Sequence, residues 1–165
     1  MKKITLLSDT HGFLDTRFFP HFKDSDEIWH AGDIGSIDVI DTLTAIAPTK
    51  AVYGNIDNHI LRRSLKPTLL FKCEKVDVMM THIGGYPNNY AKGIKEKIKQ
   101  YEPKLFVCGH SHILKVMYDK KFNVLHMNPG ATGNYGIHEV KTIIKFTIEE
   151  DNIKDLKIIE FPRKN

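Results

Sequence analysis

The chain has 165 residues, of which 41% are hydrophobic and 27% are charged, and its formal net charge is +4. These proportions are typical of a folded globular protein and argue against a disordered chain or a membrane protein. The length fits one domain with a core of its own, so we expect a single domain over residues 1–165.

The N-terminal third alternates short apolar runs with helical patterns, the order expected of a βαβ architecture. Strands are predicted at residues 3–7, 27–30 and 50–53. A short helical turn is predicted near residues 14–19, with Pro20 ending it. Ser36 is suited to cap a helix over residues 37–47, where apolar residues recur at helical spacing and which Pro48 ends.

The rest of the chain is predicted to be richer in strands. Glu74 and Lys75 should join strands 68–73 and 76–81 into a hairpin. Residues 89–101 are predicted to form an amphipathic helix that Pro103 closes. The remaining strands are expected at residues 104–108, 113–118, 122–127, 141–148 and 153–161.

Residues of the kind that bind metals occur in five short runs, namely Asp9-Thr10-His11, Gly32-Asp33, Gly54-Asn55, Thr81-His82 and Gly109-His110-Ser111-His112. Each run closely follows an apolar, strand-forming stretch, and strand ends are where open α/β sheets build their sites. Residues two apart in an extended segment point to the same side, so each Asp-x-His or His-x-His pair can reach a common region. Together the runs supply seven donors, enough for two divalent ions that share one carboxylate.

The donor types restrict which metal the runs would hold. Carboxylate, imidazole and amide donors together suit manganese, iron, zinc, cobalt or nickel better than calcium. We expect two divalent ions, with manganese as first choice. Read separately, the Gly-Asp and Gly-Asn pairs would be turns and the histidines ordinary core or surface residues. That alternative requires five independent coincidences at strand ends.

In this order, the motifs Asp-x-His, Gly-Asp, Gly-Asn, Thr-His and Gly-His-x-His resemble those of the calcineurin-like metallophosphoesterases, over residues 4–133. The Gly-Asn-x-Asp form at residues 54–57 and Asn128-Pro129-Gly130 resemble the compact bacterial and archaeal phosphodiesterases. The resemblance implies an α/β fold in which two mixed β-sheets pack as a sandwich flanked by helices. It also implies one metal bound by Asp9, His11, His112 and the bridging Asp33, and a second bound by Asn55, His82, His110 and Asp33.

The activity that the resemblance implies is phosphodiester hydrolysis by hydroxide held between the two metals. Asn55, Asp33 and His110 are the residues expected to act on the phosphoester. Many larger members carry a histidine at the position of Ile56 and use it to protonate the leaving group. That acid is missing here, and His59 is the candidate to replace it, unless it is an exposed loop histidine.

Three further residues are expected near the site. Asp57 is predicted to orient a ligand residue or simply to end the turn, and His30 to pack behind the ligands. Asn128 is predicted to help form one wall of the pocket. His21, His126 and His138 have no companion at ligand spacing, so core or surface positions are expected for them.

Two other functions stay open at this stage. A retromer subunit with this small fold works chiefly as a binding module, so the fold alone does not decide between catalysis and an interaction scaffold. The substrate-facing loops lack a pattern that would exclude a phosphomonoesterase or a nuclease.

The expected partner is a small phosphoester. Nucleic acid is not expected, because the lysines are dispersed and no stripe alternates basic with aromatic residues. No membrane partner is expected either, because the apolar run after Lys3 ends at Ser8, too early for a signal peptide or a span. We therefore expect a cytoplasmic protein, with homo-oligomerisation left open. Cys73 and Cys108 are predicted to be buried reduced thiols.

Overall fold

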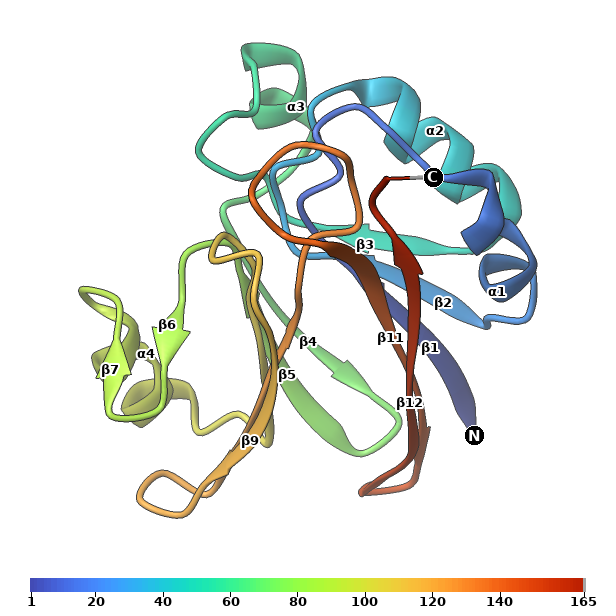
Figure 1. Ribbon diagram of the computed structural model, residues 1–165. Helices are drawn as coiled ribbons and strands as arrows, with labels where there is room; N and C mark the ends of the chain where they lie inside the picture. The colour runs from blue at the N-terminus through green and yellow to red at the C-terminus, as the bar shows by residue number, and fades with distance from the viewer. Residues whose placement is uncertain (165) are drawn as a thin grey trace.

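The structure is a computed structural model and describes residues 1–164. Two five-stranded β-sheets pack face to face (Figure 1). In spatial order the first sheet consists of β12 (Asn152–Pro162), β11 (Val140–Glu149), β1 (Lys2–Leu7), β2 (Glu27–His30) and β3 (Thr49–Ala51). The second consists of β4 (Thr68–Cys73), β5 (Val76–Thr81), β8 (Leu105–Val107), β10 (Val124–Pro129) and β9 (Leu114–Asp119).

Each sheet contains both parallel and antiparallel pairs. β1, β2 and β3 are parallel; β11 pairs antiparallel with β1, and β12 pairs antiparallel with β11. In the second sheet β5, β8 and β10 are parallel, with β4 and β9 antiparallel at the edges. The predicted class, two mixed sheets in an α/β sandwich, is confirmed.

The helices cover the outer faces of the two sheets. η1 (Thr16–Phe18), α1 (Phe19–Lys23) and α2 (Ile37–Ile46) lie on the first sheet, and α4 (Ile94–Tyr101) lies on the second. α3 (His59–Ser64) follows β3, and a small hairpin of β6 (Gly85–Tyr86) and β7 (Asn89–Tyr90) precedes α4. Among residues 1–164, no helix is both long and apolar enough to cross a membrane.

The main core lies between the sheets. In β1, Ile4 and Leu6 point inward and meet Val78 and Val107 of the second sheet, while Leu7 points outward beneath α1 and α2. Successive residues of a strand point to opposite faces, so one short strand contributes to both layers. Burial on both faces fixes the register of β1 and with it the position of the loop that follows.

Most predicted elements are present, and the hairpin at residues 68–81 has the predicted bounds. Ser36 caps α2 as predicted, accepting a hydrogen bond from the Asp38 N–H. The prediction for Pro20 was wrong: it lies in the first turn of α1, where its missing N–H costs nothing. The predicted helix at 89–101 begins only at Ile94, because Gly93 adopts a left-handed conformation before it. α3 was not predicted.

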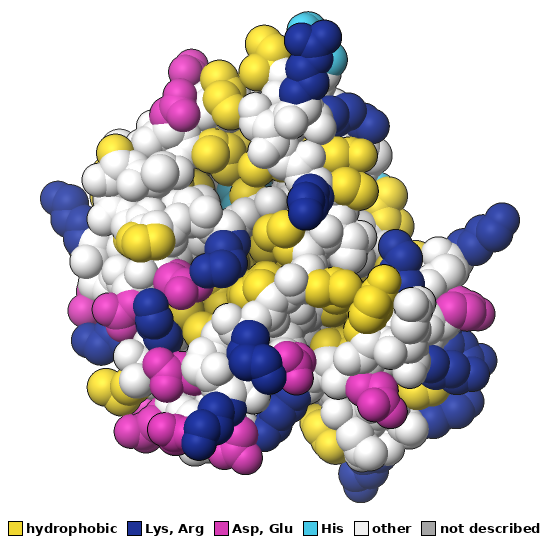
Figure 2. Space-filling view, turned by 180° about the vertical axis from the view of Figure 1, so that it is seen from behind, with side chains coloured by type: hydrophobic (Ala, Val, Ile, Leu, Met, Phe, Trp, Pro, Cys, Tyr) yellow, Lys and Arg dark blue, Asp and Glu magenta, His cyan; other side chains and the backbone are white. Residues whose placement is uncertain are grey.

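Charged side chains are dispersed on the face shown in Figure 2. Lys and Arg alternate there with Asp and Glu and form no continuous basic stripe on this face, while hydrophobic side chains gather toward its middle. This distribution gives no support to binding of a nucleic-acid backbone at this face, which requires a run of cations.

Candidate metal centre

The loops that follow β1, β2, β3, β5 and β8 meet at one edge of the sandwich. Parallel strands end at the same edge, which brings the loops of each sheet together. Hydrogen bonds then join loops of different sheets: the His82 imidazole donates from Nδ1 to the Ala31 carbonyl at 2.7 Å, and the His110 N–H donates to Asp9 Oδ2 at 3.0 Å. The five sequence runs therefore form one site.

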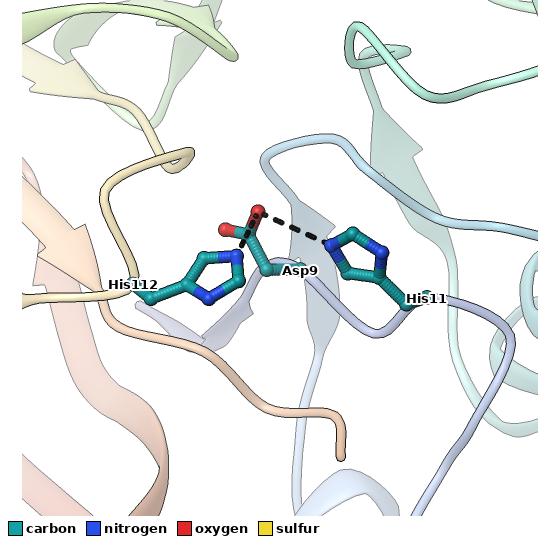
Figure 3. A group of neighbouring side chains, drawn as sticks. All are labelled: Asp9, His11 and His112. Carbon is teal, nitrogen blue, oxygen red and sulfur yellow. Dashed lines mark ion pairs between the residues drawn. The ribbon is translucent and has the colours of Figure 1, made fainter. Parts of the chain in front are cut away.

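Six of the seven predicted ligands fall into two compact groups. One contains Asp9, His11 and His112, and the other contains Asp33, His82 and His110; within each group the ligand atoms lie within 4.8 Å of one another. Figure 3 shows the Asp9 carboxylate between the rings of His11 and His112, with distances of 4.0 and 3.2 Å to their Nε2 atoms. This division matches the one implied by the family resemblance.

Asp33 lies between the two groups. Its Oδ2 is 3.6 Å from His11 Nε2, and its Oδ1 is 3.2 Å from His82 Nε2. The seventh predicted ligand, Asn55, is exposed and lines a cavity of about 280 Å³ together with His82. Asp33 is thus placed to contact ions on either side of it, with Asn55 on the side of His82.

Three buried atoms of the site have no hydrogen-bond partner within residues 1–164: Asp9 Oδ1, His11 Nε2 and His82 Nε2. Such atoms are rare in folded proteins and cost free energy when nothing satisfies them. Because Nδ1 of His82 is used by the Ala31 carbonyl, the lone pair for a metal lies on Nε2, which faces the carboxylates. The donor set fits a pair of divalent cations.

The electrostatics of the site favour positive charge. Burial raises the pKa of Asp33, but the nearby His82 imidazole and the hydrogen bond from the Ile56 N–H outweigh burial and lower it below its usual value. The pKa of Asp9 is lowered in the same way, mainly by His112 against burial. Burial opposes protonation of His82, yet Asp33 and Asp9 raise its pKa. The same negative field would attract metal ions.

Five of the candidate ligands have a left-handed backbone, an uncommon conformation for residues other than glycine. Their φ angles are 55° at Asp9, 46° at His11, 52° at Asp33, 72° at His110 and 61° at His112. Each costs on the order of 1 kcal/mol or more relative to ordinary conformations. Nothing in the sequence pattern indicated this; it results from loops that turn sharply to aim their side chains at a shared point.

Two glycines of the sequence runs allow close approach between loops. A Cβ at Gly54 would lie 2.1 Å from Asp33 Oδ1, and a Cβ at Gly109 would lie 2.0 Å from Ser8 Oγ and 2.9 Å from Asp9 Oδ2. No side chain could be accommodated at either position without moving a candidate ligand or the serine that bonds it. Their role is steric.

Asp57 joins the loops that carry Asp33 and Asn55. Its buried carboxylate accepts hydrogen bonds from the backbone N–H groups of Ile34, Gly35 and Gly54, at 3.1, 2.8 and 2.8 Å. It contacts no other acidic or imidazole side chain of the site, so its effect on the site is to fix these loops.

Asp57→Ala is expected to destabilise the protein by about 3 kcal/mol, since two buried N–H groups and the part-buried N–H of Gly35 lose their acceptor. It should also weaken Mn²⁺ binding by about tenfold to a hundredfold, because the Asp33 loop loses its support. Urea unfolding and calorimetric Mn²⁺ titration would measure the two effects. Asp57→Asn should fall in between, and the exposed Asp41→Ala should change neither. Unaltered Mn²⁺ affinity in both Asp57 variants would contradict the positioning role.

Arg62 of α3 holds the other side of the Asn55 loop. Its Nε donates to the Asp57 carbonyl at 2.7 Å, its Nη2 donates to the Asn55 carbonyl at 3.0 Å, and its guanidinium lies 4.9 Å from the ring centre of Tyr53. Sequence reasoning missed this residue. The one available signal was Asn58, a good helix cap four residues before it, which accepts from the Leu61 N–H.

His30 lies behind the ligands, as predicted, and is fully buried. The Gly32 N–H donates to its Nδ1, so its Nε2 carries the proton and donates to Thr10 Oγ1 at 2.9 Å; the Thr10 hydroxyl donates on to the Ile34 carbonyl. Burial lowers the pKa of His30 to about 4, so it is neutral at physiological pH. The chain of hydrogen bonds ties the Asp9 loop to the Asp33 loop.

Asn128 differs from its expected position, whereas the exposed position of His59 agrees with one of the two alternatives left open for it. Asn128 is buried and donates to the Gly109 carbonyl at 2.9 Å and to Ser111 Oγ at 3.1 Å, so it supports the His110 loop from beneath and forms no pocket wall. His59 is the exposed first residue of α3, and no hydrogen bond or ion pair within residues 1–164 connects it to the ligand groups.

The loop after β10 also reaches the site, and its residues 133–138 were not predicted there. This loop, orange in Figure 1, runs beside the loop that follows β1, and the Gly133 N–H donates to the Asp9 carbonyl at 3.1 Å. Tyr135 stacks on the His11 ring with 4.8 Å between centroids, and His138 meets His112 edge-on at 5.5 Å. His138 was expected in a core or surface position, and nothing in the sequence indicated its contact with the candidate ligand His112.

The fold and the two groups of candidate ligands agree with the class of metal-dependent phosphoesterases. The chain belongs to the calcineurin-like phosphoesterase superfamily, whose domain model matches residues 1–151. It is 27% identical over 135 residues to a probable metallophosphoesterase of Methanothermobacter thermautotrophicus, covering 78% of this chain and 76% of that protein. A probable metallophosphoesterase of Methanocaldococcus jannaschii is 28% identical over 152 residues, covering 89% of this chain and 76% of the relative.

Solved structures show the same fold at low sequence identity. Zinc-complexed Vps29 of Entamoeba histolytica superposes with a TM-score of 0.77 and 14% identity, covering 98% of this chain and 99% of that one. A protein of Thermotoga maritima solved by NMR gives a TM-score of 0.70 and 21% identity, covering 96% of this chain and 100% of that one.

Proposed function

We propose that this protein hydrolyses phosphodiesters with two divalent ions, one held by Asp9, His11 and His112, the other by Asn55, His82 and His110, and both by Asp33. The observation that carries the proposal is the convergence of Asp9 Oδ1, His11 Nε2 and His82 Nε2, buried and without partners within residues 1–164. Family membership supports the reaction class. Manganese is the first choice of metal on the donor types, with iron, zinc, nickel or cobalt as alternatives.

The bound ions would supply Lewis-acid charge at the phosphoryl oxygens and make water acidic enough to attack near neutral pH. The protein's own contribution is positional. Asp33 lies close to histidines of both ligand groups, and His110 and Asn55 lie at the exposed side where a phosphoester would enter. Hydrogen bonds of Asp57 and His30 fix the loops that carry the ligands. Such preorganisation removes the reorganisation that the same groups would need in water.

We propose diesters rather than monoesters because one cation, Arg62, lines the cavity beside Asn55 and His82. A phosphodiester carries a single negative charge, whereas a phosphomonoester carries about −1.5 to −2 at neutral pH and would need more compensation. The Gly-Asn-x-Asp run, with Ile56 between Asn55 and Asp57, is consistent with the compact phosphodiesterases that the chain resembles.

Metal removal and replacement tests the proposal. Protein stripped of metal should be inactive, and Mn²⁺ should restore hydrolysis of bis(nitrophenyl) phosphate to a level above that of nitrophenyl phosphate at equal concentration. Metal content should be measured on the same samples. Absence of turnover with every divalent ion, despite two bound ions per chain, would reject the enzyme; faster monoester turnover would reject the diester preference.

A second function, a protein-binding module, is favoured by one observation. Several similar structures are Vps29 proteins, and one, from Chaetomium thermophilum, is a complex with a cyclic peptide, with a TM-score of 0.62 to this chain. Metal-loaded protein without turnover would support this alternative. A cytoplasmic location, the single-domain organisation and a homo-oligomer stay predictions.

A further inference from the structure

The cavity beside Asn55 and His82 has an apolar wall. Tyr53, Pro67 and Ile83 line it, and no carboxylate does. Ile83 directly follows the candidate ligand His82 and is 43% exposed, and Ile56 directly follows Asn55 and is 46% exposed. Large apolar side chains grouped around a polar site are more informative than single exposed ones, because their burial by a ligand is favourable.

Arg62 gives the cavity a fixed cation next to this wall. Two backbone carbonyls and the Tyr53 ring hold its guanidinium, so the charge is not free to move away. A phosphoryl group at Asn55 and His82 would therefore have a cation on one side of the cavity and apolar surface on the other. This combination suits an anionic phosphoryl group that bears an uncharged apolar substituent.

The size of the cavity limits what can enter. Its volume of about 280 Å³ is slightly below the roughly 300–1,000 Å³ of pockets that enclose drug-sized ligands. It can accept one ring or a short chain, but not a whole large substrate. The remainder of the substrate would lie outside it.

We infer that this cavity binds one ester substituent of the phosphodiester, and that the substituent is apolar, an aryl ring being the best fit to the Tyr53 and Ile83 wall. The inference rests on the proposed function, since it assumes that the phosphoryl group lies at Asn55 and His82. It assigns a specificity role to Tyr53 and Ile83, which contribute no candidate metal ligand.

Two phosphonates that differ only in their substituent test this inference. The probes are the monomethyl esters of phenylphosphonate and methylphosphonate, which carry one negative charge as a phosphodiester does. Calorimetric titration of the Mn²⁺-loaded protein should show the phenyl compound binding about tenfold more tightly than the methyl compound, the scale expected for burying part of an aromatic ring. In Ile83→Ser the preference should fall to about twofold or less, with the affinity for the methyl compound unchanged. Leu156→Ser, at a 41% exposed residue of β12 outside the cavity, should keep the tenfold preference.

The outcomes separate this inference from the proposed function. Equal affinities for the two phosphonates, or a preference that survives Ile83→Ser, would overturn the apolar subsite and leave the phosphoesterase intact. Failure of both phosphonates to bind the metal-loaded protein would overturn the phosphoester site itself, and the subsite with it. Ile83 is an exposed loop residue, so its replacement should alter stability by no more than about 0.5 kcal/mol.

Discussion

Asp33→Asn is expected to lower diester hydrolysis by at least about a hundredfold in the presence of Mn²⁺. The substitution removes a negative charge that lies 3.6 Å from His11 Nε2 of one ligand group and 3.2 Å from His82 Nε2 of the other. Losing one preorganised electrostatic contact at a reacting centre typically costs about 10²- to 10³-fold in turnover. The number of Mn²⁺ ions bound per chain should fall as well.

The fold should survive this substitution. Asn is among the few residues that adopt a left-handed backbone readily, as position 33 requires, and its Oδ1 can still accept the Ile56 N–H. Steady-state kinetics, metal analysis and circular dichroism on the same preparation would check the three statements. Asp41→Asn, on the exposed face of α2, is the matched control. Full activity in Asp33→Asn would eliminate the proposed bridging role.

Ile56→His is expected to raise hydrolysis of diesters with alkyl leaving groups by about a hundredfold, the lower end of what a positioned general acid contributes. Ile56 is exposed and its N–H lies 3.1 Å from Asp33 Oδ1, so a histidine there would lie beside the centre without being buried. Nitrophenolate leaves without protonation, so nitrophenyl diesters should gain little. Without a general acid the protein should prefer esters whose leaving group needs no protonation. The substitution should extend hydrolysis to esters with poorer leaving groups.

Two controls accompany this experiment: the pH dependence of the gain, and a variant with histidine at a different position. An exposed imidazole is an acid only below its pKa of about 6.5, so the gain should shrink as the pH rises from 6 to 8. Ile60→His places the same residue on α3 at a position that is 47% exposed, and should give no gain. Equal gains for alkyl and nitrophenyl leaving groups, or a gain in Ile60→His, would show that position 56 is not the site of the missing acid.

Many strands and the helix α2 could be predicted because local pattern and tertiary structure agree, whereas the packing of two sheets into a sandwich was implied by the family resemblance alone. The hairpin at residues 68–81 consists of two runs rich in apolar residues separated by Glu74 and Lys75 and was placed with its bounds, and Ser36 marked the start of α2. Pro20 was misassigned because proline is common both just after a helix and in the first turn of a helix. The packing of Phe18 and Phe22 into the core determines that Pro20 belongs to the first turn of α1.

The ligand runs were visible in the sequence because metal donors are a restricted set of residue types at strand ends. Arg62 and Tyr135 were not, since one acts through backbone carbonyls and the other through stacking on His11. Neither contact imposes a residue type or a spacing on the chain. Such residues are found only once the loops that carry them are seen side by side.

The left-handed backbone at Asp9, His11, Asp33, His110 and His112 has an evolutionary consequence. These loops are held away from their conformational minimum by the rest of the fold, and glycine or asparagine at the same positions would relieve the strain. Under the proposed function, selection for hydrolysis would be what keeps the strained residues in place. A descendant that retained the sandwich and gave up hydrolysis could therefore gain folding stability as its ligand residues were replaced. Loss of the ligands in such a relative would lower the free energy of the folded state.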